Sequence, residues 1–285
     1  MTVPRPLLPH LRARLPALGA SDRKVAEAVL AQPGAVVFWS VAELADSAGT
    51  AKSSVVRFCQ GLGLRGFHDL KLVLAQETAV AHRPSSGEAP IANGAGQLTP
   101  PDILGAVVWS GVEMLRDSAA TVERDAFDRT AAMLARAHTV LLVGNGASAP
   151  LVHDAVQRLR AIGVRASAPA DAAGQHVAAA LLGRDDACLA ISHSGTTRAT
   201  CIAATAATDA GAATAAITSF DPSPLTEVVD HVLLAGARAV SPRLSTLTSR
   251  LGHVAVLDAL LVAVALRDEP RAVAALARAH EAGRG

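Results

Sequence analysis

The sequence predicts a two-domain protein: an all-helical N-terminal domain, then an α/β domain of three layers (αβα) with a five-stranded parallel sheet. Three observations predict this fold. Only helical patterns occur before residue 82, short apolar strand patterns alternate with helical ones after residue 138, and a stretch rich in Pro, Gly and Ser separates them at 82–101. Alternation at this spacing favours parallel strands joined by right-handed crossovers, with helices on both faces of the sheet.

Composition supports two folded domains and excludes several classes of protein. Of the 285 residues, 51% are hydrophobic and 18% charged, and the net charge is +1. This balance argues against disorder and against a basic nucleic-acid coat. Aromatic residues make up only 2%, which argues against a single-strand-binding protein with stacking platforms. Cys59, Cys188 and Cys201 show no zinc-ligand spacing, so we expect reduced thiols, no metal and no cofactor.

We expect a cytoplasmic protein without a membrane partner. The N-terminus has no uninterrupted apolar signal region. The most apolar run, residues 251–266, contains a histidine and an aspartate and is too short to span a bilayer comfortably. This run is interpreted as a core helix.

The N-terminal domain is expected at residues 1–81. Its predicted helices are 21–34, 40–49, 52–64 and 66–77. A Ser-Asp pair, Ser21 and Asp22, is expected to cap the first helix. The third helix is expected to bury its apolar residues, among them Val55 and Val56.

The remainder divides into a linker and an α/β domain. The expected segments are a linker at 82–101, a connecting helical region at 102–129, the α/β domain at 130–270 and a C-terminal helix or tail at 271–285. The predicted strands are 139–144, 163–168, 187–192, 213–218 and 231–236. The predicted helices are 102–118, 123–137, 147–162, 173–182, 196–210 and 245–267.

The helices at 40–49 and 52–64, joined by a glycine-containing turn, have the helix-turn-helix pattern. In this motif the start of the second helix enters the major groove of DNA. The residues predicted to contact DNA are short polar or cationic ones at that start: Thr50, Lys52, Ser53, Ser54 and Arg57. Arg57 suits a guanine edge or a phosphate, whereas Lys52 and Ser53 suit the DNA backbone. The alternative is an ordinary helical bundle with a solvated polar face.

The charge distribution has the sign expected of a DNA-facing N-terminal domain. Residues 1–80 contain nine Lys/Arg and six Asp/Glu, a net charge of +3, and the remainder carries −2. So small a charge should give weak binding, because affinity rises with the number of phosphates neutralised. We therefore expect two copies, as a homodimer or a dimer of dimers, on a palindromic double-stranded operator.

Two loops at the expected carboxyl ends of strands share glycines and hydroxyls. The first contributes Gly144, Asn145, Gly146 and Ser148, and the second contributes Ser192, His193, Ser194, Gly195, Thr196 and Thr197. Main-chain N–H groups and a helix dipole at such loops form an anion site that needs no lysine. Ser194 is expected to cap the helix that follows. We predict that these ten residues bind a phosphorylated small molecule at the carboxyl edge of the sheet.

Two other interpretations of the loops stay open. A hydroxyl cluster before a helix is often only a cap. The stretch 144–149 also satisfies G-x-G-x-x-A, the pattern of dinucleotide sites. Against a dinucleotide, the second strand is not followed by the acidic residue that a ribose needs, and Asp171 comes late. A phosphorylated small molecule accounts for both loops.

Together these motifs resemble the RpiR/MurR family of bacterial transcriptional regulators. The resemblance rests on SDRKVAEAVL, SVAELADSAG and SSVVRFCQGLGLRGFHDLKLVLA in the N-terminal domain. In the C-terminal domain it rests on GNGAS, ISHSGTT and SRLGHVAVLDALLVAVAL, which match the SIS (sugar isomerase) domain. It covers roughly residues 5–80 and 130–268. It implies an αβα sandwich that dimerises, binds a phosphosugar and changes the operator affinity of the DNA-binding head.

The resemblance assigns phosphosugar contacts to Ser148, Ser192, Ser194 and Thr197. Glycines 144, 146 and 195 then shape the loops. The chain departs from the family pattern at Ala51, where a serine usually begins the recognition helix. The cap must then come from Thr50 or Ser53, or be weaker by about 1 kcal/mol. His193, between the two serines, either tunes the loop to one sugar or is an exposed spacer.

A regulator is favoured over an enzyme or a purely structural dimerisation module. An aldose–ketose isomerase is the alternative, since SIS domains also serve enzymes, and it needs a general base facing the sugar. The candidate bases are His176, Asp171, His231 and His253, none of them in a recognisable catalytic sequence. No catalytic residue is predicted, and an isomerase has no use for a helix-turn-helix head.

Overall fold

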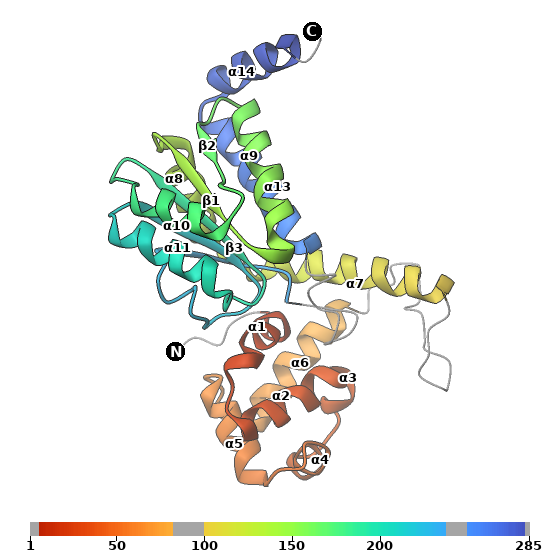
Figure 1. Ribbon diagram of the computed structural model, residues 1–285. Helices are drawn as coiled ribbons and strands as arrows, with labels where there is room; N and C mark the ends of the chain where they lie inside the picture. Colours follow the sequence, from red (N-terminus) through yellow and green to blue (C-terminus); the bar gives the residue numbers. More distant parts are fainter. Residues whose placement is uncertain (1–5, 82–99, 238–249, 283–285) are drawn as a thin grey trace. The chain divides into compact units, whose positions relative to one another are not determined.

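The computed structural model describes residues 6–81, 100–237 and 250–282 (Figure 1). The chain forms two compact units, Met1–Trp109 and Ser110–Gly285, and the boundary between them lies within one long helix, α7 (Pro100–Thr121). No helix among the described residues is both long and apolar enough to cross a membrane. The expected linker at 82–101 lies outside the described residues except for its last two positions, where α7 begins.

The first unit is a helical domain around one apolar core. Its elements are α1 (Leu7–Arg14), η1 (Leu15–Ala17), α2 (Ala20–Ala31), α3 (Pro33–Val36), α4 (Val41–Ser47), α5 (Lys52–Gly61) and α6 (Phe67–Ala81). Their core includes fully buried leucines, Leu7, Leu44 and Leu70. No sequence pattern predicts α1, whose Leu8 N–H donates to a carboxylate oxygen of Glu77 at 3.0 Å. This cap comes from a residue about 70 positions away, so no local pattern reveals it.

Two details of the N-terminal domain differ from expectation. The residue before α2 is Gly19, which makes no side-chain cap, so Ser21 and Asp22 lie inside the helix instead of capping it. Val56 is 38% exposed, whereas Val55 is buried. The reason is helical geometry: Val56 lies about 100° around the axis from Val55, outside the face of α5 on which Val55, Phe58 and Cys59 are buried.

The second unit contains the predicted five-stranded parallel sheet, which is confirmed. Its strands are β1 (Val140–Val143), β2 (Ala166–Ser167), β3 (Ala187–Ser192), β4 (Ala213–Thr218) and β5 (His231–Leu234). Their order across the sheet is β2-β1-β3-β4-β5, and every neighbouring pair is parallel. The chain therefore winds outward in two directions from β1 and β3, and the crevice between these strands at their carboxyl ends is the switch point of the sheet.

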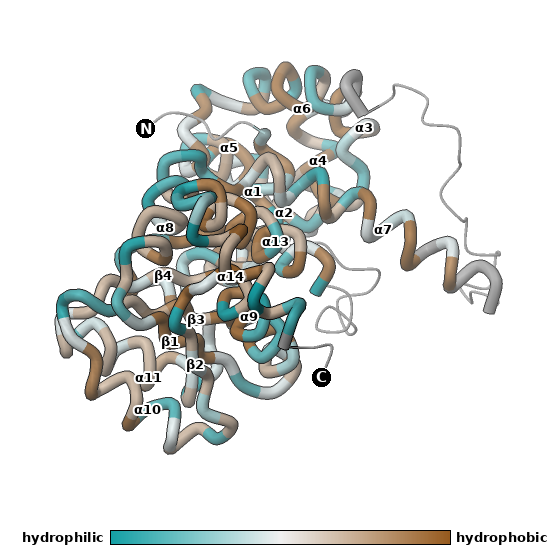
Figure 2. The backbone as a smooth tube through the Cα atoms, turned by 90° about the horizontal axis from the view of Figure 1, so that it is seen from above, coloured by the Kyte–Doolittle hydropathy of each residue, from teal (hydrophilic) through white to brown (hydrophobic). Residues whose placement is uncertain are grey.

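Helices cover both faces of this sheet (Figure 1). They are α8 (Arg124–Arg136), α9 (Ala149–Ala161), α10 (Ala172–Ala180), α11 (Arg198–Asp209), α13 (Arg250–Arg267) and α14 (Glu269–Ala282). One apolar cluster joins one face of the sheet to α8, α9 and α13, and another joins the opposite face to α10 and α11. β1 and β3 are coloured hydrophobic in Figure 2, as strands buried on both faces should be.

The observed elements follow the predicted ones with small shifts. β2 keeps only two residues of the predicted strand at 163–168. The first five residues of the predicted helix at 245–267 lie outside the described residues, and α13 begins at Arg250. In the predicted tail, α14 buries Ala272 and Ala275, and Ala275 approaches Gly163 at the end of α9. α14 thus packs against α9.

Candidate functional site

The turn between α4 and α5 has the geometry of a helix-turn-helix. α4 begins with a complete capping box, in which the Ser40 hydroxyl accepts from the Glu43 N–H and the Glu43 carboxylate accepts from the Ser40 N–H. It ends at Ser47, and Gly49, two residues later, has a φ of +58°. The N–H of Thr50 then donates to the Ala45 carbonyl at 2.9 Å, which closes the turn.

The start of α5 is open to solvent. Its N-cap position is Ala51, which makes no side-chain hydrogen bond, so neither Thr50 nor Ser53 replaces the missing cap. Lys52, Ser53 and Arg57 are exposed. Within the described ranges, neither Lys52 nor Arg57 forms an ion pair. This face therefore presents two unpaired cations.

Two of the five predicted DNA contacts are less exposed. Ser54 is half-buried. The Thr50 hydroxyl oxygen is buried and has no hydrogen-bond partner among the described residues. The backbone hydrogen bond to Ala45 holds Thr50 inside the turn, and the Thr50 hydroxyl therefore does not face solvent in this conformation.

The two glycine-hydroxyl loops lie side by side at the switch point of the sheet. Val143, the last residue of β1, is in register with Ala190 of β3, so the loops that follow are neighbours. A Cβ at Gly144 would lie 2.7 Å from a Val152 methyl and 2.9 Å from the Ile191 carbonyl oxygen. Only glycine lets the first loop approach the second strand this closely.

The first loop is held by side chains from two helices. Gln175 of α10, only 1% exposed, accepts from the Gly144 N–H at 3.3 Å and from the Asn145 amide at 3.1 Å. Its own amide donates to the Pro169 carbonyl, and Asn145 also donates to Thr200 at 3.1 Å. Gln175 and Thr200 were not predicted, because no local motif marks a residue that acts on a loop thirty or more positions away.

The second loop is held by its own hydroxyls. Ser192 is buried, and its hydroxyl accepts from the Gly195 N–H at 3.2 Å and donates to the Thr197 hydroxyl at 3.3 Å. Gly195 has a φ of +66°, and a Cβ there would lie 2.1 Å from the Ser223 hydroxyl oxygen. The glycine is therefore required both by its conformation and by its neighbour.

Both helices that begin at these loops lack a side-chain cap. Thr197 is the N-cap residue of α11, and Ser148 that of α9, and neither side chain accepts from its helix. The prediction that Ser194 caps α11 is wrong: its hydroxyl accepts from the N–H and the hydroxyl of Thr196, inside the loop. By contrast, Asp171 caps α10 through the Gly174 N–H at 2.8 Å. The first N–H groups of α11 thus point toward the switch point without a side-chain acceptor. At the start of α9, by contrast, the Ala149 N–H donates to the Gly146 carbonyl and Pro150 has no N–H.

His193 extends the site toward α13. Its Nδ1 lies 2.8 Å from the Ser219 hydroxyl, which lies 3.0 Å from Nε2 of His253. Nε2 of His253 is also 3.1 Å from the Ala235 carbonyl. Burial lowers the pKa of His193 to about 4. Burial, with a smaller contribution from His193, also lowers the pKa of His253 to about 4.

The other candidate bases lie away from the loops or are engaged. Asp171 is the cap of α10. His176 is exposed on α10, and His231 begins β5, at the amino end of the sheet. Only His253 is connected to the loops, through Ser219, and its pKa near 4 leaves it neutral.

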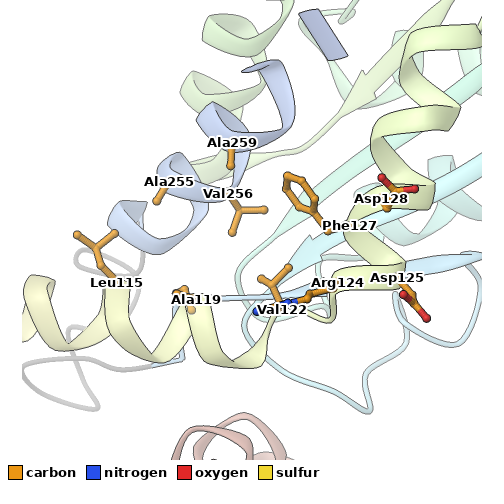
Figure 3. A pocket seen from close by; sticks show the side chains of 11 residues that line it. Leu115, Ala119, Val122, Arg124, Asp125, Phe127, Asp128, Ala255, Val256 and Ala259 are labelled. Atoms are coloured by element: carbon orange, nitrogen blue, oxygen red, sulfur yellow. The ribbon is translucent and has the colours of Figure 1, made fainter. Parts of the chain in front are cut away.

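A pocket of about 520 Å³ lies between α7, α8 and α13 (Figure 3). Val122, Phe127 and Val256 line it, with Arg124 and two aspartates nearby. No residue of either glycine-hydroxyl loop lines this pocket. Its walls are mainly apolar, so they do not suit a phosphate, which needs N–H or cationic donors.

Comparison with protein families identifies both units. A model described as a helix-turn-helix domain of the rpiR family matches residues 6–81, and a SIS domain model matches residues 133–263. The chain belongs to the RpiR family of helix-turn-helix transcriptional regulators with a SIS domain.

Relatives are named as regulators. The HTH-type transcriptional regulator HexR of Pseudomonas aeruginosa is 30% identical over 262 residues, 92% of this chain and 90% of that protein. YfhH of Escherichia coli, an uncharacterized HTH-type transcriptional regulator, is 30% identical over 266 residues, 91% and 92% of the two chains.

Solved structures share the fold. The Vibrio vulnificus NanR protein complexed with ManNAc-6P has a TM-score of 0.59 and 23% identity and covers 96% of this chain and 97% of its own. The sugar isomerase domain of an RpiR transcription factor from Sphaerobacter thermophilus has a TM-score of 0.57 and 27% identity, covering 61% of this chain and 96% of its own.

Proposed function

We propose that this transcriptional regulator senses a sugar phosphate with its SIS domain and changes its affinity for an operator in response. The observation that supports this most directly is the uncapped start of α11 beside the hydroxyls at the switch point. Unsatisfied N–H groups at a helix start, together with the helix dipole, attract a phosphate. In a parallel sheet this is also the place where ligands bind.

The phosphate is bound by neutral groups in this proposal. The N–H groups at the start of α11 and the hydroxyls of Ser192, Ser194 and Thr197 surround it, and Ser148 lies at the start of α9. The Ser148 hydroxyl makes no hydrogen bond within the described part of the chain, so it is available to a ligand. Glycines 144, 146 and 195, with Asn145, His193 and Thr196, complete the set of ten.

A structural neighbour supports a phosphosugar. NanR, which shares the fold, was solved in complex with ManNAc-6P, a phosphorylated sugar. The identity of the sugar for this chain is a separate question, because NanR is only 23% identical to it.

DNA is bound by α5 in this proposal. Lys52, Ser53 and Arg57 face the major groove or its phosphates, and Ser54 and Thr50 adjoin them. A homodimer on a palindromic operator brings two such heads to DNA. Exposed apolar residues on the helices of the second unit, Val112 and Leu115 on α7 and Val262 on α13, offer a surface for that dimer.

The effector changes DNA affinity only if it binds two arrangements of the dimer unequally. By reciprocity, operator DNA must then change the affinity for the effector by the same factor. This reciprocity can be measured without knowing which direction the regulation takes.

The test is a double variant, Ser192→Ala with Ser194→Ala. We expect it to lose sugar phosphate binding in calorimetry, and to keep operator binding but lose its response to sugar phosphate in gel-shift assays. Thr205→Ala, on α11 two turns beyond the loop, is the matched control and should behave as the parent. Sugar phosphate binding of parental strength in the double variant would place the effector elsewhere.

A further inference from the structure

The hydrogen bonds between His193, Ser219 and His253 determine where the protons of this group lie. The Ala235 carbonyl oxygen can only accept, so Nε2 of His253, 3.1 Å away, carries a hydrogen and donates it. Ser219 is fully buried, and its hydroxyl oxygen has two side-chain neighbours, the His253 and His193 ring nitrogens. Since His253 is a donor, the Ser219 hydrogen must go to Nδ1 of His193, 2.8 Å away.

The consequence for His193 is a defined tautomer. With Nδ1 accepting from Ser219, the ring proton of neutral His193 lies on Nε2. Both histidines are neutral at pH 7 because burial holds each pKa near 4. Within the described residues, His193 Nε2 has no hydrogen-bond partner, and it does not belong to the buried unsatisfied atoms. It is therefore a donor that a ligand can reach.

We propose that His193, oriented by Ser219 and His253, is the specificity-determining residue of the effector site and donates its Nε2–H to an oxygen of the sugar. This inference rests on the proposed function, because it assumes that the loop of Ser192 and Ser194 binds the phosphate of the same molecule. The chemical class it selects is a sugar phosphate with a hydroxyl or carbonyl oxygen at this position. A bare phosphate gains nothing from it.

The donor is fixed because reversing the hydrogen bonds is unfavourable. If His193 were to accept through Nε2, its Nδ1–H would donate to Ser219, and Ser219 would have to donate to His253. Nε2 of His253 would then direct a lone pair at the Ala235 carbonyl, leaving a buried acceptor unsatisfied. A ligand group that can only donate, such as an ammonium, is therefore disfavoured at this position.

The first experiment measures the tautomer of His193 in the full-length protein by ¹⁵N NMR at pH 7. We expect the Nε2–H form in the parent and a mixture of both neutral forms in Ser219→Ala, which removes the hydroxyl and keeps the imidazole. An Nδ1–H form in the parent would overturn the inference, whether or not any sugar phosphate binds.

The second experiment compares two amide substitutions. Gln places its amide near the position of Nε2, whereas Asn reaches only to that of Nδ1, so H193Q can keep the donor and H193N cannot. The probes are inorganic phosphate and the tightest binder among glucose 6-phosphate, fructose 6-phosphate and ribose 5-phosphate. The measured quantity is the ratio of the affinities for sugar phosphate and for inorganic phosphate.

We expect H193N to lower this ratio at least fivefold and H193Q to keep it within about twofold of the parent. A ratio in H193N equal to that of the parent overturns the role of His193 and leaves the proposed function standing. If no sugar phosphate in the panel binds the parent, the proposed function fails and the inference fails with it. The two failures are therefore distinguishable.

Discussion

α5 in the DNA-binding domain and α11 in the SIS domain begin in the same way and differ in what surrounds their starts. Neither N-cap residue, Ala51 or Thr197, caps its helix with a side chain. Around α5 the neighbours are exposed and cationic, whereas α11 follows a loop held by the buried hydroxyl of Ser192. A long polyanion suits mobile cations at a solvated surface, and a small anion suits fixed neutral donors in a crevice.

The two helix starts are expected to differ in how tightly the preceding loop is packed. This difference is tested by placing alanine at the glycine that precedes each helix. Gly195→Ala adds a Cβ that meets Ser223 and forces a non-glycine residue to a φ of +66°. We expect it to lower the free energy of unfolding of the SIS domain by about 2–5 kcal/mol, from backbone strain and overpacking together. Urea denaturation measures this loss.

Gly49→Ala is the matched control for that variant in the DNA-binding domain. Gly49 has a similar φ of +58°, but no atom lies within 4 Å of the Cβ position. Strain alone should cost about 1–2 kcal/mol. Equal losses at the two glycines would contradict the view that the α11 loop is the more tightly packed.

The half-buried His193 and the buried His253 of the SIS domain give the next largest effect. Their pKa values near 4 lie below the ordinary value of 6.5, so between pH 6.5 and pH 4 the unfolded state binds more protons than the folded one. Stability is thus retained above pH 6.5 and lost as the pH falls toward 4, by up to about 1.4 kcal/mol per pH unit for each histidine. H253Q should flatten this profile in urea denaturation between pH 4 and pH 7. If stability in H253Q depends on pH as steeply as in the parent, His253 does not contribute to this pH dependence.

For α5, Arg57→Ala should weaken operator binding by about 1–3 kcal/mol if Arg57 contacts a base. If it contacts only a phosphate, the loss should be similar for all sequences and the salt dependence should decrease by about one ion. Gel-shift titrations at several salt concentrations separate the two cases. Arg65→Ala is the control, because Arg65 pairs with Asp69. An unchanged midpoint in Arg57→Ala removes Arg57 from the interface.

The smallest expected effect is a gain. Ala51→Ser supplies the cap that α5 lacks and should stabilise the DNA-binding domain by about 0.5–1 kcal/mol in thermal unfolding. If the first N–H groups of α5 also contact a DNA phosphate, the added hydroxyl competes for them and operator binding should weaken slightly. If the variant is more stable but binds the operator as tightly as the parent, the first N–H groups of α5 do not contact a DNA phosphate. The start of α5 would then differ from that of α11, where the N–H groups are proposed to bind a phosphate.

The sequence was sufficient for the features that local patterns determine. Five apolar runs predicted the parallel sheet, and the glycines of GNGAS and SHSGTT placed both loops at its switch point. Gln175, Ser219 and Ser223 could not be predicted from the sequence, because each acts on a loop through tertiary contact and belongs to no motif. The Val56 prediction was wrong because apolar character alone does not specify which side of a short helix faces the core. The buried hydroxyl of Thr50 depends on the turn that places it.

Gln175 connects the first loop to α10 before any ligand arrives, through the Gly144 N–H, the Asn145 amide and the Pro169 carbonyl. The loop is therefore ordered when the domain folds, and binding has little conformational entropy left to remove. A ligand as small as a sugar phosphate makes few contacts. With one wall of its site already ordered, more of its binding free energy remains to favour one arrangement of the dimer over the other.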